Sequence, residues 1–201
     1  MKSDKRWLQR QNSDPYVKQA RNSSYRSRAV YKLQQIDQRD KLFRPGQLVV
    51  DLGAAPGSWS QYVAEKILPS GKLIALDILE MQPIKDVEFI QGDFTEQSVF
   101  DQCLQSLGGK RADLVISDLA PNLTGIRDTD QARSMYLSEL VLDFASRVLT
   151  QHGSLLLKVF EGSGMEQFKR SLSEQFQKVS VRKPDASRAA SREFYILARR
   201  N

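Results

Sequence analysis

The sequence predicts an α/β fold with a mostly parallel, doubly wound sheet. Apolar stretches of strand length alternate with helical stretches of ten or more residues along most of the chain, a pattern typical of right-handed βαβ crossovers. Some apolar stretches, such as "LLL" in "GSLLLKVF", continue without a polar residue, as strands buried on both faces do. Because the chain has 201 residues and 40% hydrophobic composition, we expect a single domain, 1–201, with one core.

The first elements are basic. Residues 1–22 are polar and basic with interleaved aromatic residues, and we expect a loosely ordered arm that orders on RNA. Residues 24–40 carry apolar residues at helical spacing, which predicts a helix with one face toward the core. We expect Arg26, Arg28 and Lys32 to lie on the basic face of this helix.

Strands and helices then alternate. Strands are expected at 47–52, 72–78, 87–93, 112–119, 153–160, 178–184 and 192–200, and helices at 58–67, 98–107, 129–149 and 165–176. The last two strands are too close together for a helix between them. One of them is therefore expected to enter the sheet antiparallel, as part of a hairpin.

Charge is divided unevenly along the chain. Residues 1–46 carry a net charge of +8 and residues 178–201 carry +5, whereas residues 47–177 carry −7. This division favours a polyanion bound by the ends and a neutral or cationic ligand bound by the middle, although a solvated surface accounts for a basic tail equally well. A single Cys103 and a single His152 argue against a metal cluster, and without a signal-like apolar segment we expect a cytoplasmic protein.

Ligands of such folds bind at the carboxyl ends of the strands. The first strand ends in "VVDLGAAPG", where Gly53 and Gly57 let a ligand approach the backbone. The spacing is not G-x-G-x-x-G, which disfavours an NAD-dependent enzyme. Asp77 and Asp93 end the next two strands, and each alone is more often a turn residue. Together, and without a G-x-x-x-x-G-K-[ST] loop, these features predict an adenosine pocket for a positively charged nucleoside.

The stretches "VDLGAAPGSWSQYV" and "SDLAPN" closely resemble the bacterial FtsJ (RlmE) family of ribosomal RNA large-subunit methyltransferases. The resemblance extends over essentially the whole chain, from "RSRAVYKL" through "KVFEG" to "RKPDASRAASREFYI". It implies a Rossmann-like S-adenosylmethionine-dependent methyltransferase fold, with seven strands and an antiparallel last strand. It also implies methylation of a uridine ribose 2′-hydroxyl in 23S rRNA, in support of subunit assembly. The family usually has glycine where this chain has Ser58, and the serine is expected to narrow the loop slightly.

The resemblance also implies site residues. The family's cofactor contacts fall on Gly57, Trp59, Asp77, Asp93 and Asp118, next to the turn at Gly53, and its catalytic tetrad falls on Lys32, Asp118, Lys158 and Glu193. We expect Lys158 to accept the hydroxyl proton and Asp118 to orient Lys158. Lys32 and Glu193 are then expected to position the ribose. Two other interpretations stay open, namely Trp59 as a residue packed on the sheet and Lys32 as a phosphate contact.

Basic residues near both ends are the candidates for RNA contacts: Arg26, Arg28, Lys32, Arg182, Lys183, Arg188 and Arg192. They are expected to converge if the N-terminal helix and the last hairpin flank the active site, with "DASRAASRE" as a mobile loop. A tRNA ribose methyltransferase shares the tetrad and is the nearest alternative. A non-catalytic RNA-binding assembly factor is the alternative from another class, and it needs neither the pocket nor the tetrad. We expect a monomer.

Overall fold

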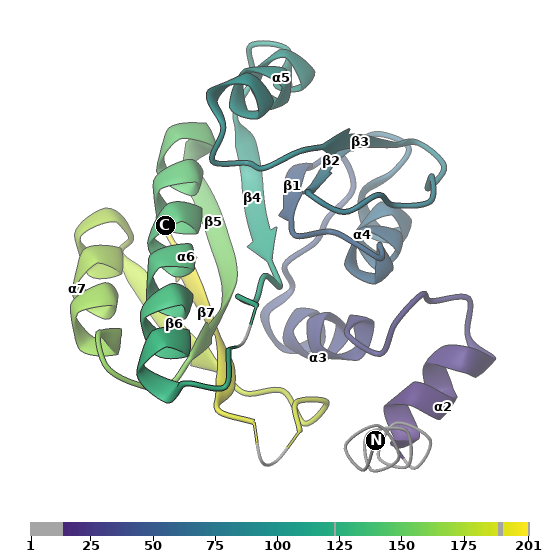
Figure 1. The fold of residues 1–201 in the computed structure, drawn as a ribbon. Coiled ribbons are helices and arrows are strands. Elements are labelled where there is room, and N and C mark those ends of the chain that lie inside the picture. Colours follow the sequence, from purple (N-terminus) through teal and green to yellow (C-terminus); the bar gives the residue numbers. More distant parts are fainter. Residues whose placement is uncertain (1–13, 123, 189–190, 201) are drawn as a thin grey trace.

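The computed structural model describes residues 14–122, 124–188 and 191–200. One seven-stranded sheet has the strand order β3-β2-β1-β4-β5-β7-β6 (Figure 1). The strands are β1 (Leu48–Leu52), β2 (Lys72–Asp77), β3 (Val87–Gln91), β4 (Ala112–Ser117), β5 (Leu149–Phe160), β6 (Lys178–Arg182) and β7 (Glu193–Arg199). Strands β1 to β5 pair in parallel, and β7 is antiparallel to both of its neighbours, β5 and β6. The predicted sheet is confirmed.

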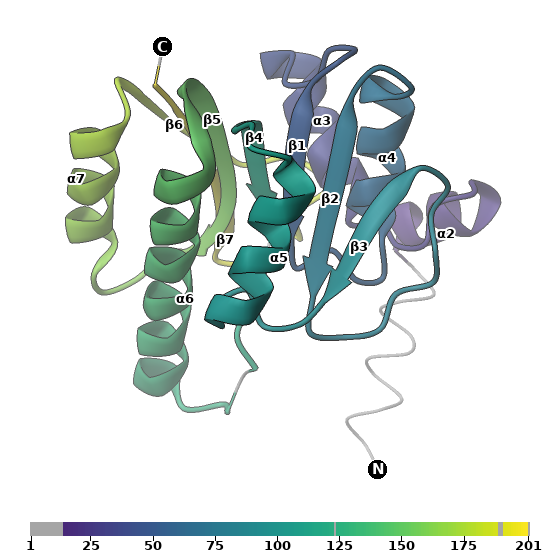
Figure 2. The same cartoon turned by 90° about the horizontal axis from the view of Figure 1, so that it is seen from above.

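Helices cover both faces of the sheet (Figure 2). They are α2 (Pro15–Asn22), α3 (Val30–Asp40), α4 (Ser58–Ile67), α5 (Gln97–Leu107), α6 (Arg127–Val148) and α7 (Met165–Gln175). Val49 and Leu73 pack in the cluster that contains α3 and α4, whereas Val50 and Ile74 pack in the cluster that contains α5, α6 and α7. Successive residues of one strand thus face opposite layers, which explains why the central strands are apolar throughout.

The helix predicted for residues 24–40 begins only at Val30. The backbone before it pairs with α4, since the side-chain oxygen of Gln61 accepts the N–H of Arg26 at 2.9 Å. Arg26 and Arg28 therefore precede the helix, and the prediction that they lie on it is wrong, whereas Lys32 is helical.

Part of the predicted arm is a packed helix. The Asp14 side chain accepts the N–H of Tyr16 and caps α2, and Ala20 is buried. The rings of Tyr16 and Tyr31 lie 5.6 Å apart between α2 and α3. The structure differs here from the expected loose arm because α2 buries apolar side chains on α3. The rest of the arm lies outside the described residues.

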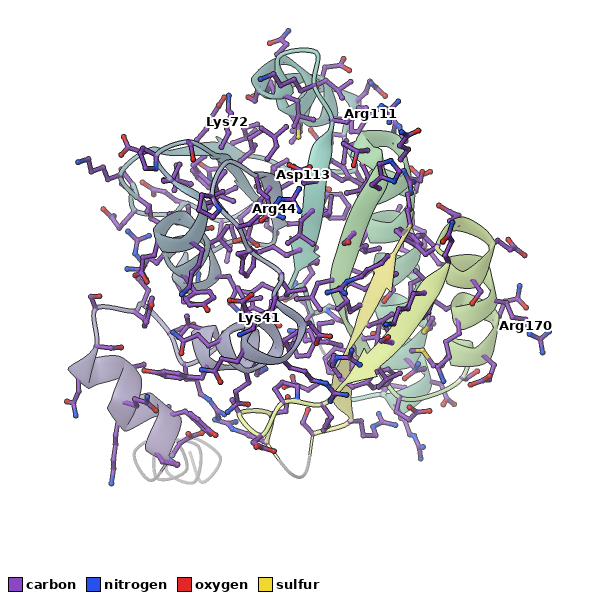
Figure 3. The ribbon with its side chains drawn as sticks, turned by 180° about the vertical axis from the view of Figure 1, so that it is seen from behind. Lys41, Arg44, Lys72, Arg111, Asp113 and Arg170 are labelled. Carbon is purple, nitrogen blue, oxygen red and sulfur yellow. The ribbon has the colours of Figure 1, made fainter. Side chains whose placement is uncertain are left out.

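The strand starts are fixed at the opposite end of the sheet from the carboxyl ends of the parallel strands. The Asp113 carboxylate accepts the N–H of Leu48 at 2.9 Å and lies 3.7 Å from the guanidinium of Arg44 (Figure 3). Strand β5 starts earlier than predicted because Leu149 pairs with Ala112 of β4. In the described part of the chain, no helix is long and apolar enough to cross a membrane.

Candidate active site

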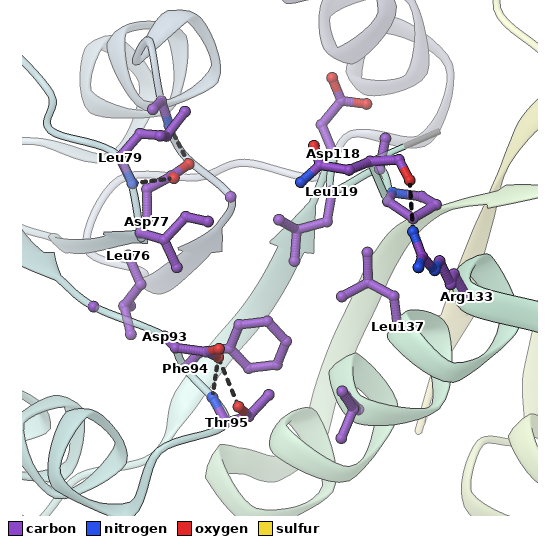
Figure 4. Close-up of a pocket in the computed structure, with 18 of the residues that line it drawn as sticks. Leu76, Asp77, Leu79, Asp93, Phe94, Thr95, Asp118, Leu119, Arg133 and Leu137 are labelled. Carbon is purple, nitrogen blue, oxygen red and sulfur yellow. Dashed lines mark hydrogen bonds between the residues drawn. The ribbon is translucent and has the colours of Figure 1, made fainter. Parts of the chain in front are cut away.

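The carboxyl ends of β1 to β4 surround a cavity of about 830 Å³ (Figure 4). Its acidic lining consists of Asp77, Asp93 and Asp118, and its apolar lining includes Phe94, Leu119, Leu137 and Leu140. The volume lies within the range of small-ligand sites. Three carboxylates from three successive strand ends make the cavity suitable for a ligand with hydroxyl groups and positive charge.

The turn after β1 is fixed by Asp77. One oxygen of its carboxylate accepts the N–H of Ala55 at 2.8 Å, and the other accepts the N–H of Leu79 at 2.8 Å. Gly53 has a φ of +78°, and a Cβ there would come within 2.3 Å of the Leu119 side chain. The turn therefore needs glycine at this position both for its backbone conformation and for its contact with the loop after β4.

Asp93 lies on the other side of the cavity. One oxygen of its carboxylate accepts both the N–H and the hydroxyl of Thr95, at 2.9 Å and 2.7 Å. These two bonds fix the carboxylate beside Phe94, whose ring packs edge-on against Phe144. A carboxylate next to an apolar wall is suited to bind a nucleobase that has an amino group.

Gly57 and Trp59 are not in the described lining of this cavity. Trp59 is 3% exposed, donates from Nε1 to the carbonyl of Ala29 at 2.8 Å, and packs against Tyr195. Gly57 starts α4 with a φ of +106°. Trp59 thus joins α4 to the segment before α3, and its contact with the cofactor stays a prediction.

The four tetrad positions form two lysine–carboxylate pairs. Nζ of Lys32 lies 2.5 Å from Glu193, and Nζ of Lys158 lies 3.2 Å from the Asp118 carboxylate. Lys158 also donates to the backbone carbonyl of Asp118 at 2.6 Å. Burial raises the pKa of Glu193, but the ammonium groups of Lys32 and Lys158 outweigh it, and the net pKa is lowered. Glu193 is therefore ionised at neutral pH.

Tyr195 joins the two pairs, although no sequence pattern marked it as a site residue. Its hydroxyl donates to the Asp118 carboxylate at 2.6 Å, and its ring centroid lies 6.0 Å from Nζ of Lys32. Tyr195 is fully buried. Burial, followed by the Asp118 charge, raises its pKa well above the usual value, so the hydroxyl remains a donor. The pairing register of β5 and β7 would have indicated it, because Tyr195 lies directly opposite Lys158.

Asp51 lies beneath the turn and was given no role from the sequence. It is 1% exposed and accepts the hydroxyl of Ser60 at 2.6 Å. The pKa of Asp51 is raised to about 7, mainly by burial and to a smaller extent by the charges of Asp118 and Asp77, while the hydrogen bond from Ser60 opposes the increase. Asp51 thus changes its charge near neutral pH.

The predicted RNA-binding residues do not converge as one cluster. Arg26 donates to the carbonyls of Pro56, Gln82 and Pro83, and so braces the loops beside the glycine turn. Arg182 forms two 2.6 Å bonds with Asp40. Both arginines therefore have structural partners within the protein, in contrast to the expected contacts with RNA.

The remaining basic candidates lie nearer the tetrad. Arg28, Lys32 and Arg188 line a groove of about 430 Å³ that also contains Glu193. Lys183 donates to the carbonyls of Ser191 and Glu193, and Arg192 is exposed just before β7. The loop between β6 and β7 lies beside α2 and α3 (Figure 1); part of the predicted mobile loop, residues 189 and 190, lies outside the described residues.

Residues 14–122, 124–188 and 191–200 contain no group of three or more His, Cys, Asp or Glu side chains that could hold an ion. Cys103 is buried, and burial raises its pKa to about 12, so the thiol stays protonated.

Comparison with known proteins identifies the family. The model of the FtsJ-like methyltransferase family matches residues 25–201. The relative named ribosomal RNA large subunit methyltransferase E from Marinobacter nauticus is 55% identical, covering 98% of this chain and 96% of the relative. The protein of the same name from Pseudomonas aeruginosa PAO1 is 54% identical with the same coverage.

Solved structures agree with this result. A crystal structure from Plasmodium falciparum, provisionally assigned as a ribosomal RNA methyltransferase, has a TM-score of 0.78 and 30% identity, covering 87% of this chain and 97% of that one. A provisionally assigned methyltransferase from Streptococcus mutans, solved with S-adenosylhomocysteine, has a TM-score of 0.53 at 13% identity, covering 83% of this chain and 94% of that one, and shows the fold alone. The chain therefore belongs to the FtsJ-like methyltransferase family, which confirms the predicted methyltransferase fold and S-adenosylmethionine as the cofactor.

Proposed function

We propose that this protein methylates the ribose 2′-hydroxyl of a uridine in 23S rRNA of the large ribosomal subunit, and that the methylation supports subunit assembly. The observation that carries the proposal is that two lysine–carboxylate pairs, joined by Tyr195, adjoin a cavity suited to a nucleoside, which Asp118 lines. The names of the relatives support ribosomal RNA as the acceptor. Uridine and the 2′ position are supported by the motifs that resemble the family.

The cavity fits S-adenosylmethionine in charge and in the kinds of side chain that it offers. Asp77 would hold the ribose hydroxyls, since a carboxylate that accepts two backbone N–H groups keeps further lone pairs. Asp93 and Phe94 would hold the adenine, and Gly53 would admit the methionine part. When bound, the cofactor supplies a methyl group on a positively charged sulfur, which Asp118 favours electrostatically.

The chain's own residues handle the hydroxyl proton. The Lys158 ammonium first releases a proton to solvent, and its neutral Nζ then accepts the proton of the 2′-hydroxyl. Asp118 holds Nζ through both its carbonyl and its carboxylate, and Tyr195 fixes the carboxylate in turn. The amine is thereby positioned by two hydrogen-bonded groups before RNA arrives, which is how geometry contributes to general base catalysis.

Lys32 and Glu193 position the ribose. The ionised Glu193 carboxylate accepts hydrogen bonds from hydroxyl groups, and the Lys32 ammonium fixes that carboxylate. The 2′-hydroxyl distinguishes RNA from DNA, so a site built around it selects RNA. Phosphate contacts from Arg28 and Arg188 in the neighbouring groove position the strand without reading its sequence.

The test is methyl transfer from labelled S-adenosylmethionine to large subunits that lack ribose methylation, with naked 23S rRNA and tRNA in parallel. We expect label in the rRNA of the subunits and resistance of the modified linkage to alkaline hydrolysis, because a methylated 2′-oxygen cannot attack its phosphate. Lys158→Ala should abolish transfer, and Lys169→Ala, which removes a lysine on the surface of α7, should not.

Each other outcome identifies an alternative. Label in tRNA alone would replace the proposal with a tRNA ribose methyltransferase. Label that alkaline hydrolysis of the rRNA releases in mononucleotides would place the methyl group on a base. Cofactor binding without transfer to any of the RNAs would favour a non-catalytic assembly factor.

A further inference from the structure

The groove beside the tetrad lies outside the cavity that fits the cofactor. Its volume is about 430 Å³, and its walls include Arg28, Lys32, Arg188, Ser191 and Glu193. Two of these residues, Lys32 and Glu193, belong to the tetrad as well. The groove therefore opens directly onto the atoms that would position the ribose.

A carboxylate of the protein itself binds the basic wall of this groove. Asp14 forms an ion pair with Arg28 and lies 3.7 Å from Nε of Arg188. Its other oxygen accepts the N–H of Tyr16 at 3.0 Å and caps α2. The Asp14 side chain, which is 10% exposed, thus links the start of α2 to the groove.

The two arginines are only partly satisfied by this carboxylate. Arg28 donates one hydrogen bond from Nη1 to the Asp14 carboxylate and another from Nη2 to the carbonyl of Ala186. Its Nε is buried without a partner in the described part of the chain. The Arg188 side chain is 48% exposed. A guanidinium carries five N–H donors and pairs bidentately with phosphate oxygens. Two guanidinium groups around one carboxylate oxygen therefore suit an anion with more acceptor oxygens.

We propose that Arg28 and Arg188 form a subsite for a phosphodiester of the RNA, and that Asp14 occupies this subsite until RNA displaces it and releases the start of α2. The inference deepens the proposed function and rests on it, since the phosphodiester belongs to the methyl acceptor. The covalent structure of RNA supports the location. The 2′-oxygen and the 3′-phosphate are attached to adjacent ribose carbons, so a phosphate site has to lie next to the residues that hold the 2′-hydroxyl.

Asp14→Asn tests the displacement without removing the cap, because asparagine is as good an N-cap residue as aspartate. The matched control is Asp185→Asn, which removes the same charge from an exposed position of the β6–β7 loop. We expect Asp14→Asn to lower the KM for the RNA about three- to ten-fold relative to the control, the size of a partly buried ion pair. The change in KM should exceed any change in kcat. An increase in KM, or a value equal to that of the control, would overturn the proposal.

A double-mutant cycle tests whether the effect of Asp14→Asn on the KM depends on Arg188. Arg188→Gln should raise the KM in the wild-type background. The gain from Asp14→Asn should shrink when Arg188 is already absent, because the two changes act on one subsite. Fully additive effects would mean that Asp14 acts elsewhere, and the proposal would fail.

Hydrogen exchange separates this inference from the proposed reaction, since it needs no methyl transfer. Amides in the first turn of α2 should exchange faster when a 23S rRNA fragment binds, and Asp14→Asn should speed their exchange without RNA. Slower exchange on RNA binding would show that α2 clamps the RNA with Asp14 in place, which is the opposite mechanism. Faster exchange in a protein that methylates none of the tested RNAs would keep the subsite and overturn the reaction.

Discussion

The cavity at the ends of β1 to β4 and the groove beside α3 are assembled from different kinds of contact. In the cavity, Asp77 and Asp93 each bond backbone groups of the next few residues or of the neighbouring turn. In the groove, Arg28 reaches Asp14 and Ala186, which lie in segments far apart along the chain. The first kind of site is visible in a short motif, whereas the second exists only after the chain has folded.

Lys158→Ala should lower kcat by at least about a hundred-fold, because general base catalysis typically contributes 10² to 10⁴. The Kd for S-adenosylmethionine should change little, since Lys158 contacts Asp118 and does not line the cavity among the described residues. Single-turnover transfer and calorimetric binding measure the two quantities. Lys158→Arg is the control for charge, and near-normal turnover in either variant would refute the assignment of the base.

Asp51→Asn should change the free energy of unfolding differently at pH 8 and pH 4. Relative to wild type, the variant should be more stable at pH 8 than at pH 4 by about 2 to 4 kcal/mol. In the folded protein Asp51 has a pKa of about 7, whereas its ordinary value is 3.8. The folded chain therefore keeps a proton that the unfolded chain has lost, and wild-type stability falls as the pH rises from about 4 to 7. Denaturant unfolding of both proteins across this range checks the slope. Parallel curves for the two proteins would contradict the buried acid.

Arg182→Gln should lower the free energy of unfolding by about 2 kcal/mol, because it leaves Asp40 without its bidentate partner. Arg182 lowers the pKa of Asp40, mainly through these hydrogen bonds. The wild-type advantage should therefore be present above the ordinary pKa of an aspartate and be lost at lower pH. RNA affinity should fall no more than in Arg39→Gln, a neighbouring charge on α3. A much larger loss of RNA affinity in Arg182→Gln than in Arg39→Gln would show that Arg182 contacts RNA.

Gly53→Ala should weaken cofactor binding about ten-fold or more, since the new Cβ would overlap Leu119 and the backbone has a positive φ. Gly109→Ala is the matched control, because it has a φ of +75° but open space around the new atom. The double variant Gly53→Ala, Leu119→Ala should recover part of the affinity. An unchanged affinity in the single variant would show that Leu119 moves at little cost.

Tyr195→Phe should lower kcat about three- to ten-fold, the size of one hydrogen bond that orients a neighbouring group, while the Kd for the cofactor stays close to wild type. The phenol is the donor that fixes Asp118, and phenylalanine keeps the packing on Trp59. A pre-steady-state measurement of transfer is required, since product release can hide a change of this size. An unaltered rate of the chemical step would make Tyr195 a packing residue only.

The sequence predicted the cavity better than the groove for a physical reason. Gly53, Asp77 and Asp93 follow strands whose apolar pattern marks where they end, so their common edge could be inferred from topology. The fold was predicted on the same basis, with errors at the boundaries of α3 and β5. The tetrad positions came from resemblance to a family and from no local pattern.

The partners of the arginines could not be predicted from the sequence. Asp40 pairs with Arg182 from 142 positions away, and no periodicity links them. Tyr195 was missed for a related reason, because an inward-facing aromatic on a buried strand is usually core. Only the pairing of β5 with β7 reveals that it faces Lys158.

The position of β7 has a consequence for protein synthesis. This strand is the last of the seven to leave the ribosome, yet it inserts between β5 and β6 and brings Glu193 and Tyr195 to the site. None of the described residues that line the cavity comes from β7, whereas one of the two carboxylates of the tetrad positions does. We therefore expect a chain that ends before β7 to lack methyl transfer, because Glu193 and Tyr195 both lie on that strand.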